Sequence, residues 1–355
     1  MNNTPEFNIA EFDSGSGKKI RSYFSRIGMG LTLMLLCSVG IQMATAALVR
    51  KYAPAIIETD WFIWVLSLAP MYLVGLPFML TFAKKIPQAA PQKHKMKLGH
   101  WMIALLMSFG VLYAGNYIGS FITVFINTAR GKETVNLVEN ALSMSSPLFS
   151  FIATVLIAPI LEELVFRRFI INRTRAYGEK TAVVFSALLF GLYHGNIQQF
   201  FYAFGVGILF GYIYVRTGKV KYTVFLHMII NFFGSIVGMF VLKYANYEAV
   251  MEFYEQISQS GYMESIMQDM EAYNLYLARF SELLPDMLII IAYTSVMGGL
   301  ALAGAILMLV KRRKFVYKKS ELQLPSDRVG STVYMNIGVF TLIIVCAGIM
   351  LYSLL

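Results

Sequence analysis

The stretch Leu161-Glu162-Glu163-Leu164-Val165-Phe166-Arg167-Arg168 places two carboxylates and two guanidinium groups inside a run that is otherwise apolar. The surrounding run, 148–171, is long enough to cross a bilayer, which needs about 20 predominantly apolar residues. Charged side chains within a spanning segment are costly, and by default they mark a functional site. The stretch therefore predicts a membrane-spanning helix that carries chemistry within the membrane.

The rest of the chain repeats the apolar pattern. Of its 355 residues, 57% are hydrophobic and 14% are charged, whereas a soluble domain has about 25% charged residues. Nine runs are candidate spans, and the fifth and sixth are short and closely connected, which predicts a tight helical hairpin. The runs are Ile27–Val49, Trp61–Ala83, Leu98–Ile126, Leu148–Ile171, Thr181–His194, Phe200–Val215, Tyr222–Leu242, Met287–Val310 and Val333–Leu355. The predicted fold is all-α: a polytopic transmembrane helical bundle of about eight to nine spans.

Basic residues set the predicted orientation. With the N-terminus in the cytoplasm, 23 of the 30 Lys and Arg residues fall in cytoplasmic segments and 6 in outer ones, as the positive-inside rule requires. The net charge of +10 is then explained by anchoring to anionic headgroups of the lipid bilayer, and no nucleic-acid partner is expected. We predict a multi-pass protein of the cell membrane with a cytoplasmic N-terminus.

The same pattern predicts a basic cytoplasmic N-terminal segment over residues 1–26 and a membrane domain over residues 27–355. Within the membrane domain we expect the catalytic core at 148–243 and an acidic outer loop at 244–285. The loop holds seven acidic residues and one basic residue, with apolar residues at helical spacing. It is interpreted either as a solvated amphipathic helix pair or as a lid or substrate-docking element.

The polar groups inside the spans concentrate in three neighbouring helices. Glu163 and Arg167 are four residues apart and can form an ion pair on one helix face, which leaves Glu162 without a sequence-local partner. His194 ends the short fifth span, and the seventh span contains His227. Facing helices of a bundle are a standard place for a carboxylate–imidazole site, so we expect these groups to converge.

This set permits peptide hydrolysis, which needs an activated water, a proton for the leaving amine and stabilisation of the oxyanion. Glu162 is the candidate base and later acid, and Asn231, four residues after His227, is a candidate donor to the oxyanion. His194 and His227, together with Glu162, match the three-ligand pattern of a catalytic zinc site. If Glu162 or Glu163 is a ligand, the other must be the base. Residue types alone leave open both a metal-bound water and a metal-free water held by glutamate and histidine.

Three short motifs occur in order on successive membrane helices. They are EExxxR at Glu162, Glu163 and Arg167, FxxxH at Phe190 and His194, and HxxxN at His227 and Asn231. Each motif is weak alone, but the ordered set resembles the signature of the CAAX-processing and bacteriocin-processing endopeptidases, the CPBP or Abi family of intramembrane proteases. The resemblance covers residues from about Leu148 to Leu242, which is under a third of the chain.

The resemblance implies a bundle of about eight helices that hydrolyses a peptide bond in a membrane-associated protein or peptide, of the CAAX type or of the bacteriocin and peptide-processing class. Carried over by position, Glu162 activates water, and His194 assists it or binds metal. His227 and Asn231 stabilise the oxyanion or complete the site. The catalytic set also includes Glu163, supported by Arg167 and Phe190. The family is commonly described as metal-dependent, and a metal-free glutamate mechanism has also been argued for it.

Two other classes of protein are compatible with the same residues. One is a non-catalytic membrane immunity or scaffold protein that keeps the fold. The other is a proton-coupled transporter that uses Glu162, His194 and His227 as a relay. The sequence shows no internal repeat and no inverted pair of broken helices, which counts against a secondary transporter.

Overall fold

A computed structural model describes residues 16–132, 134, 145–320 and 322–354. Every regular element among these residues is a helix. Seven helical runs are long and apolar enough to cross a membrane, and the shorter apolar helix α17 (Ile337–Tyr352) follows them. The runs are α2 (Gly17–Tyr52), α3 to α4 (Phe62–Ala83), α5 (Leu98–Arg130), α7 to η6 (Pro147–Tyr177), α11 (Ile197–Thr217), α12 to α13 (Lys221–Tyr244) and α16 to η8 (Met270–Lys314). The predicted polytopic all-α bundle is confirmed.

The fifth predicted span is α10 (Glu179–Tyr193), a helix of 15 residues. Residues 194–196 join α10 to α11, so the predicted tight hairpin is present. The predicted segment 1–26 lies partly outside the described residues, and its described part from Gly17 onward already belongs to α2.

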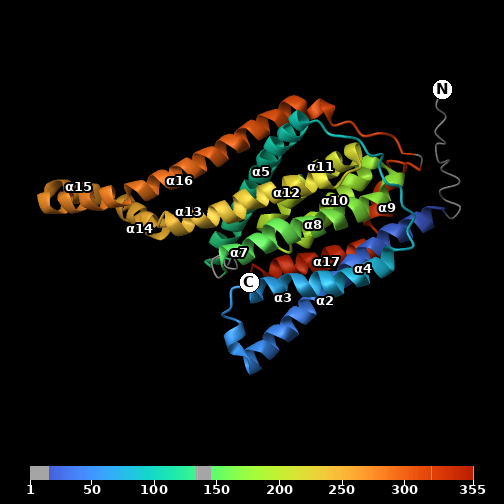
Figure 1. Cartoon of the computed structure of the whole chain (residues 1–355), viewed down its shortest axis with the longest axis horizontal. Coiled ribbons are helices and arrows are strands. Elements are labelled where there is room, and N and C mark those ends of the chain that lie inside the picture. The colour runs from blue at the N-terminus through green and yellow to red at the C-terminus, as the bar shows by residue number, and fades with distance from the viewer. Residues whose placement is uncertain (1–15, 133, 135–144, 321, 355) are drawn as a thin grey trace.

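The central hairpin lies between two groups of helices (Figure 1). On one side are α2, α4 (Leu76–Ala83) and α17, and on the other are α5 and α16. Direct contacts between α10 and α11, α11 and α5, and α2 and α17 support this order. In the view of Figure 1, the helices that carry the predicted motifs, α8 (Ala158–Glu163), α10 and α12 (Lys221–Asn231), lie between these two groups, and α12 contacts α5, α8 and α11.

Glycines allow the outer helices to approach closely. A side-chain carbon added at Gly304 of α16 would collide with the backbone of α5, and one added at Gly338 of α17 would collide with the backbone of α2. Membrane helices associate through such small residues, because lipid offers no hydrophobic driving force between helices. Close backbone packing thus fixes α16 and α17 against the bundle.

The fourth span changes its winding around the glutamate pair. The π-helical segments η4 (Phe151–Ile157) and η5 (Leu164–Ile171) flank α8 on both sides. Pro159 lies at the start of α8 and cannot donate the helical hydrogen bond of its position, so the preceding turn must widen or kink. Wide turns of this kind occur frequently at functional sites, because they re-aim side chains that an α-helix would direct elsewhere.

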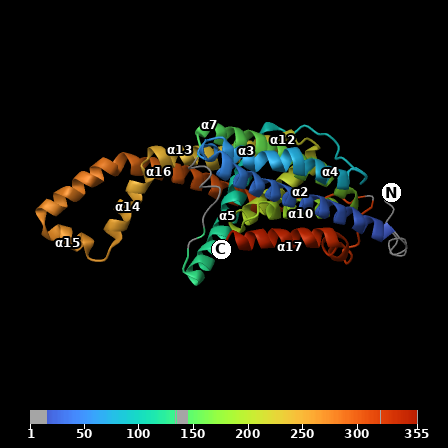
Figure 2. The same ribbon diagram turned by 90° about the horizontal axis from the view of Figure 1, so that it is seen from below.

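The acidic segment after α13 (Gly238–Tyr244) is helical, as its spacing predicts. It forms α14 (Tyr247–Ser258), α15 (Tyr262–Gln268) and the first turns of α16 (Met270–Lys311). Phe253 is buried and stacks on Tyr276 with ring centroids 5.6 Å apart. Figures 1 and 2 show this helical extension projecting away from the bundle.

The predicted eighth span, Met287–Val310, is only the second part of α16, which begins at Met270 and contains Pro285 in its interior. Hydropathy indicates where a helix enters the lipid rather than where the helix begins, so the predicted span starts 17 residues after the first residue of α16. The role of the acidic segment stays a prediction.

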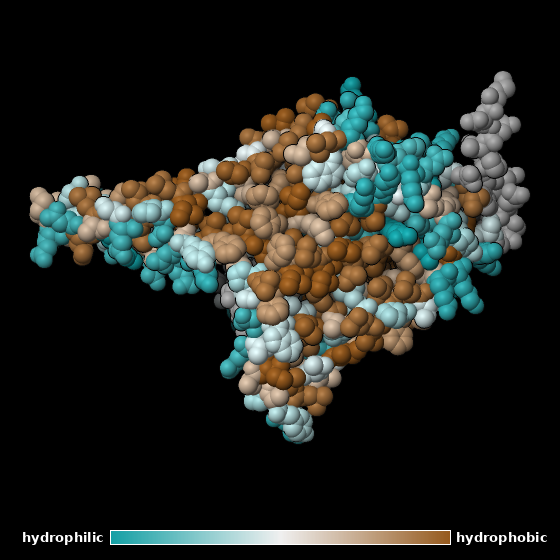
Figure 3. All heavy atoms as spheres, in the orientation of Figure 1, coloured by the Kyte–Doolittle hydropathy of each residue, from teal (hydrophilic) through white to brown (hydrophobic). Residues whose placement is uncertain are grey.

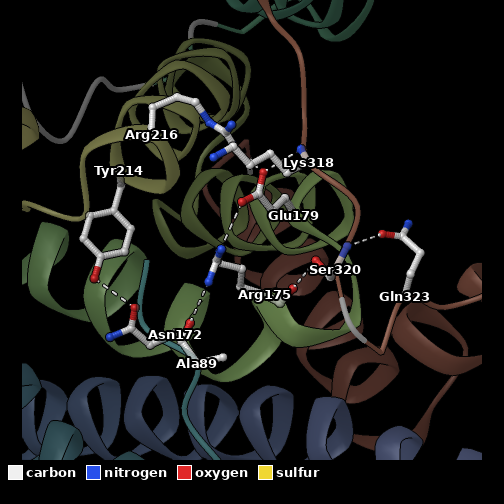
Figure 4. Close-up of polar contacts among 9 residues, drawn as sticks. All are labelled: Ala89, Asn172, Arg175, Glu179, Tyr214, Arg216, Lys318, Ser320 and Gln323. Atoms are coloured by element: carbon white, nitrogen blue, oxygen red, sulfur yellow. Dashed lines mark hydrogen bonds and ion pairs between the residues drawn. The ribbon is translucent and has the colours of Figure 1, made fainter. Parts of the chain in front are cut away.

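We call the end of the bundle where the basic connections lie the basic end. A cluster of polar side chains links several helices there. Figure 3 shows the hydrophilic surface gathered there beside a hydrophobic central band. Figure 4 shows the Glu179 carboxylate at the centre of the cluster. It pairs with Arg175 at 3.2 Å and with Arg216, and it accepts the backbone N–H of Lys318 at 2.8 Å. Glu179 is buried, so one carboxylate ties α10, α11 and the 315–320 connection together.

We expect Glu179→Gln to destabilise the protein without altering the fold. The substitution keeps the shape of the side chain but removes the charge that both arginines contact, and hydrogen bonds to a charged group contribute about 1.5–3 kcal/mol. Thermal unfolding of the purified chain in detergent should show a lower melting temperature. Glu255→Gln is the matched control, because Glu255 is exposed on α14; equal melting temperatures for both variants would contradict the role given to Glu179.

Candidate functional site

The predicted ion pair in the fourth span is present and completely buried. Arg167 Nε lies 3.2 Å from Glu163 Oε2, and both side chains are fully shielded from solvent. The guanidinium also donates to Ser186 Oγ at 3.5 Å and lies 4.6 Å from the centroid of the Phe190 ring. Two contacts from α10 thus hold a charge that lipid would not tolerate, and the face of the fourth span that carries it is fixed against α10.

His227 lies between the two glutamates. Its Nδ1 is 3.2 Å from Glu163 Oε1, and its Nε2 is 3.7 Å from Glu162 Oε2. The predicted meeting of the fourth and seventh spans is therefore present. Because an ionised carboxylate can only accept hydrogen bonds, the contact with Glu163 places the proton of a neutral His227 on Nδ1. The other ring nitrogen, Nε2, then carries no proton, and its lone pair points toward Glu162.

The two neighbouring glutamates differ in their surroundings. Glu163 is fully buried, whereas the Glu162 side chain is 20% exposed. Successive residues of a helix point about 100° apart, so one carboxylate enters the core and the other remains partly exposed. Glu163 contacts Arg167 and His227 inside the bundle, whereas the Glu162 side chain is not completely enclosed.

His194 is oriented by the backbone of its own helix. Its Nδ1 lies 2.7 Å from the carbonyl oxygen of Phe190, so Nδ1 donates and Nε2 remains an acceptor in the neutral ring. The Phe190 ring contacts both imidazoles, with centroids 4.8 Å from His194 and 5.9 Å from His227. The two histidines therefore lie around one aromatic ring.

The register of α10 against the fourth span explains why His194 lies at the site. Ser186 Oγ donates to the carbonyl oxygen of Phe166 at 2.6 Å, which fixes α10 against the fourth span. In an antiparallel pair, moving one turn back from Phe166 to Glu162 corresponds to moving one turn forward along α10 to Phe190. His194 follows one turn later, at the end of the helix.

Asn231 turns its amide toward the fourth span. Its Nδ2 donates to the carbonyl oxygen of Thr154 at 2.8 Å. The Thr154 hydroxyl in turn lies 3.1 Å from the Ser235 hydroxyl. One of the two amide hydrogens of Asn231 is therefore engaged, and the residue links α12 to the widened turn before Pro159.

Metal binding requires several donors at one point. Within the described parts of the chain, no group of three or more His, Cys, Asp and Glu side chains is placed to hold a metal ion. The set Glu162, His194 and His227 thus does not form a three-ligand site in this arrangement. Both histidines nevertheless hydrogen-bond through Nδ1, as the outer-shell bonds of metal-ligating histidines do, so zinc stays a prediction that experiment must test.

Sequence reasoning missed two tyrosines beside the site. The Tyr193 hydroxyl is buried, and no hydrogen-bond partner for it exists among the described residues. The Tyr202 ring, from α11, lies against the His194 ring with centroids 6.3 Å apart. Tyrosine is common on membrane helices, so only the position of Tyr193 directly before His194 could have drawn attention to it.

Comparison with known proteins matches this region to a family. Residues 144–233 match the model of the Type II CAAX prenyl endopeptidase Rce1-like family. The matched stretch contains Glu162, Glu163, His194, His227 and Asn231. The resemblance predicted from the three motifs is thereby confirmed over these residues.

Two curated relatives are similar to the chain. One is the "Putative membrane peptidase YdiL" of Bacillus subtilis (strain 168), 27% identical over 171 residues, which cover 47% of this chain and 63% of the relative. The other is the "Membrane-embedded CAAX protease MroQ" of Staphylococcus aureus (strain USA300), 33% identical over 119 residues, covering 31% of this chain and 45% of the relative. The chain thus matches less than two thirds of the length of either relative. No solved structure matches.

The fold and the comparisons together indicate one class of protein. The chain is a polytopic membrane protein whose residues 144–233 are similar to the Rce1-like CAAX endopeptidases. The two relatives carry the names of a membrane peptidase and a membrane-embedded protease.

We expect Arg167→Ala to lower the stability of the protein strongly. The substitution leaves the Glu163 carboxylate buried without its cation, and breaking a buried ion pair in this way costs about 3–5 kcal/mol. The amount of folded protein in membranes, measured by quantitative immunoblotting and by size-exclusion chromatography of detergent extracts, should fall sharply. The neighbouring Arg168 is exposed, so Arg168→Ala provides the control. Normal abundance and a monodisperse profile for Arg167→Ala would refute this role.

Proposed function

We propose that this protein is an intramembrane endopeptidase in which Glu162 activates the hydrolytic water. The observation that carries the proposal is the position of His227 between Glu163 and Glu162. A histidine held by one buried carboxylate and facing a second, partly exposed carboxylate is suited to orienting a water for attack. The family match and the names of the two relatives support the same class of reaction.

The 3.7 Å gap between Glu162 Oε2 and His227 Nε2 is longer than a hydrogen bond, but both atoms can lie at about 2.8 Å from one water oxygen. Such a water donates one hydrogen to each acceptor, and its lone pairs then point away from both groups. As the oxygen attacks a peptide carbonyl, Glu162 takes the proton. The carboxylic acid formed in this way later protonates the leaving amine.

The remaining residues stabilise and position this reaction. Asn231 has a second amide hydrogen beyond the one donated to Thr154, and that hydrogen can bind the oxyanion of the tetrahedral intermediate. His194, with Nε2 as an acceptor, orients Glu162 or the substrate through a hydrogen bond. Glu163 and Arg167 hold His227 and the fourth span in place.

The substrate that this proposal implies is a peptide bond in a membrane-associated protein or peptide, of the CAAX type or of the bacteriocin and peptide-processing class. The protein acts in the cell membrane with its N-terminus in the cytoplasm, as the distribution of basic residues requires. The catalytic core is 148–243, which closely overlaps the family match. A non-catalytic scaffold would not require a carboxylate and an imidazole spaced to share one water.

We expect Glu162→Gln to reduce cleavage at least about a hundredfold, because the amide keeps the shape but cannot take the proton. Membranes that contain the wild type or the variant should be compared by mass spectrometry of released peptides. Abundance in the membrane should not change, since Glu162 is partly exposed and has no role in the buried ion pair. Glu282→Gln on the exposed acidic extension is the control. Near-normal peptide release by Glu162→Gln would refute the general-base role.

Treatment with a chelator distinguishes activation of a metal-bound water from activation of a water by glutamate and histidine alone. We expect cleavage by the purified chain to persist after treatment with a zinc chelator such as phenanthroline and removal of the chelator by dialysis. The reason is that the described side chains do not group three donors around one point. Elemental analysis of the purified protein should accordingly show zinc far below one equivalent. Loss of activity that added zinc restores would establish a metal site.

A further inference from the structure

A groove lies at the basic end of α2, on an element that contributes none of the motif residues. One wall is a stripe of α2 residues spaced three and four apart, which places them on one helix face. The stripe consists of Lys18, Arg21, Ser22, Ser25, Arg26 and Met29. The groove has a volume of about 470 Å³.

The opposite wall comes from two helices that are distant in sequence. Phe82 belongs to α4, and Asn336 and Ile337 form the start of α17. Among the residues that the structure describes, no acidic side chain lines the groove. Its wall therefore combines three cations and two hydroxyls with the apolar side chains of Met29, Phe82 and Ile337.

Two hydrogen bonds hold the walls together. The Arg21 guanidinium donates to the carbonyl oxygen of Met335 at 2.5 Å, and Ser25 Oγ accepts the backbone N–H of Gly338 at 3.0 Å. Lys18 and Arg26 are exposed, and within the described chain neither forms an ion pair. The groove thus has a fixed frame and two cations available to an external anion.

The position of the groove along α2 matters. The basic stripe ends at Arg26, and the apolar run of the first span starts at the next residue, Ile27. The groove therefore lies at the level where lipid headgroups meet the hydrocarbon. It lies at the basic end of the bundle, which the positive-inside rule assigns to the cytoplasmic leaflet, where anionic lipids concentrate.

We propose that this groove binds an anionic phospholipid, with its phosphate between Lys18, Arg26 and the serine hydroxyls and the start of an acyl chain along Phe82 and Ile337. The two available cations, Lys18 and Arg26, attract an anion, and hydroxyl groups donate hydrogen bonds to phosphate oxygens. The apolar half of the groove has no use in binding a free phosphate ion, so the combination selects an amphiphile. A lipid at this position joins α2, α4 and α17 from outside, independently of the proposed catalysis.

The test uses the full chain purified in a neutral detergent. A fluorescent short-chain phosphatidylglycerol is titrated against the wild type, and a phosphatidylcholine with the same chains serves as the second probe. We expect tighter binding of phosphatidylglycerol and a rise in melting temperature with its concentration. Arg26→Gln and Lys18→Gln should each weaken phosphatidylglycerol binding about fivefold, the effect of one basic residue near an anionic lipid surface.

Lys19→Gln is the matched control, because Lys19 is exposed beside Lys18 on the same helix but does not line the groove. Equal weakening by Lys19→Gln and Arg26→Gln would show general surface attraction and overturn the site. Equal affinity for phosphatidylglycerol and phosphatidylcholine would overturn it as well. Glycerol phosphate without acyl chains is the third probe: if it binds as tightly as phosphatidylglycerol, the groove is a site for free phosphate groups and the lipid proposal fails.

Discussion

The ion pair between Glu163 and Arg167 is the constraint on which the site depends. Both side chains are fully buried in a helix that crosses the membrane. Either charge alone would be strongly unfavourable there, so the pair must form and must stay formed. Its remaining contacts reach α10 through Ser186 and Phe190 and α12 through His227. One electrostatic requirement therefore positions three helices relative to one another.

The same pair gives two chemically identical residues different surroundings. Glu163 is enclosed by Arg167 and His227, whereas Glu162, one residue earlier, is partly exposed and faces the other nitrogen of the same imidazole. Environments that separate two carboxylates in this way are a general means of assigning structural and acid–base roles. The widened helical turns on both sides of the pair and Pro159 allow the fourth span to present both side chains in these directions.

The ends of the bundle are organised by charge in a different way. At the basic end, the buried Glu179 carboxylate gathers two arginines and a backbone N–H, which binds a long connection to the hairpin. The groove of α2 at the same end keeps its cations facing outward. The opposite end carries the acidic helical extension, so the protein presents contrasting charges on its two sides. A bilayer with an anionic inner leaflet favours this polarity.

The sequence by itself determined the membrane bundle, the ion pair at a spacing of four residues and the ordered motif set, because hydropathy and helical periodicity are local properties. The ends of the helices were predicted less accurately, as the early start of α16 shows. The reason is that hydropathy does not detect the part of a helix that lies outside the lipid. Only the tertiary structure decided which nitrogen of His227 faces which glutamate, that Asn231 binds the Thr154 carbonyl, and that Tyr193 and Glu179 occupy buried polar positions. The same holds for the groove, where Arg21 bonds Met335 across 314 residues of sequence. Such contacts depend on the register, tilt and depth of packed helices, which are set by the fit between distant surfaces and leave no signature within a single stretch of chain.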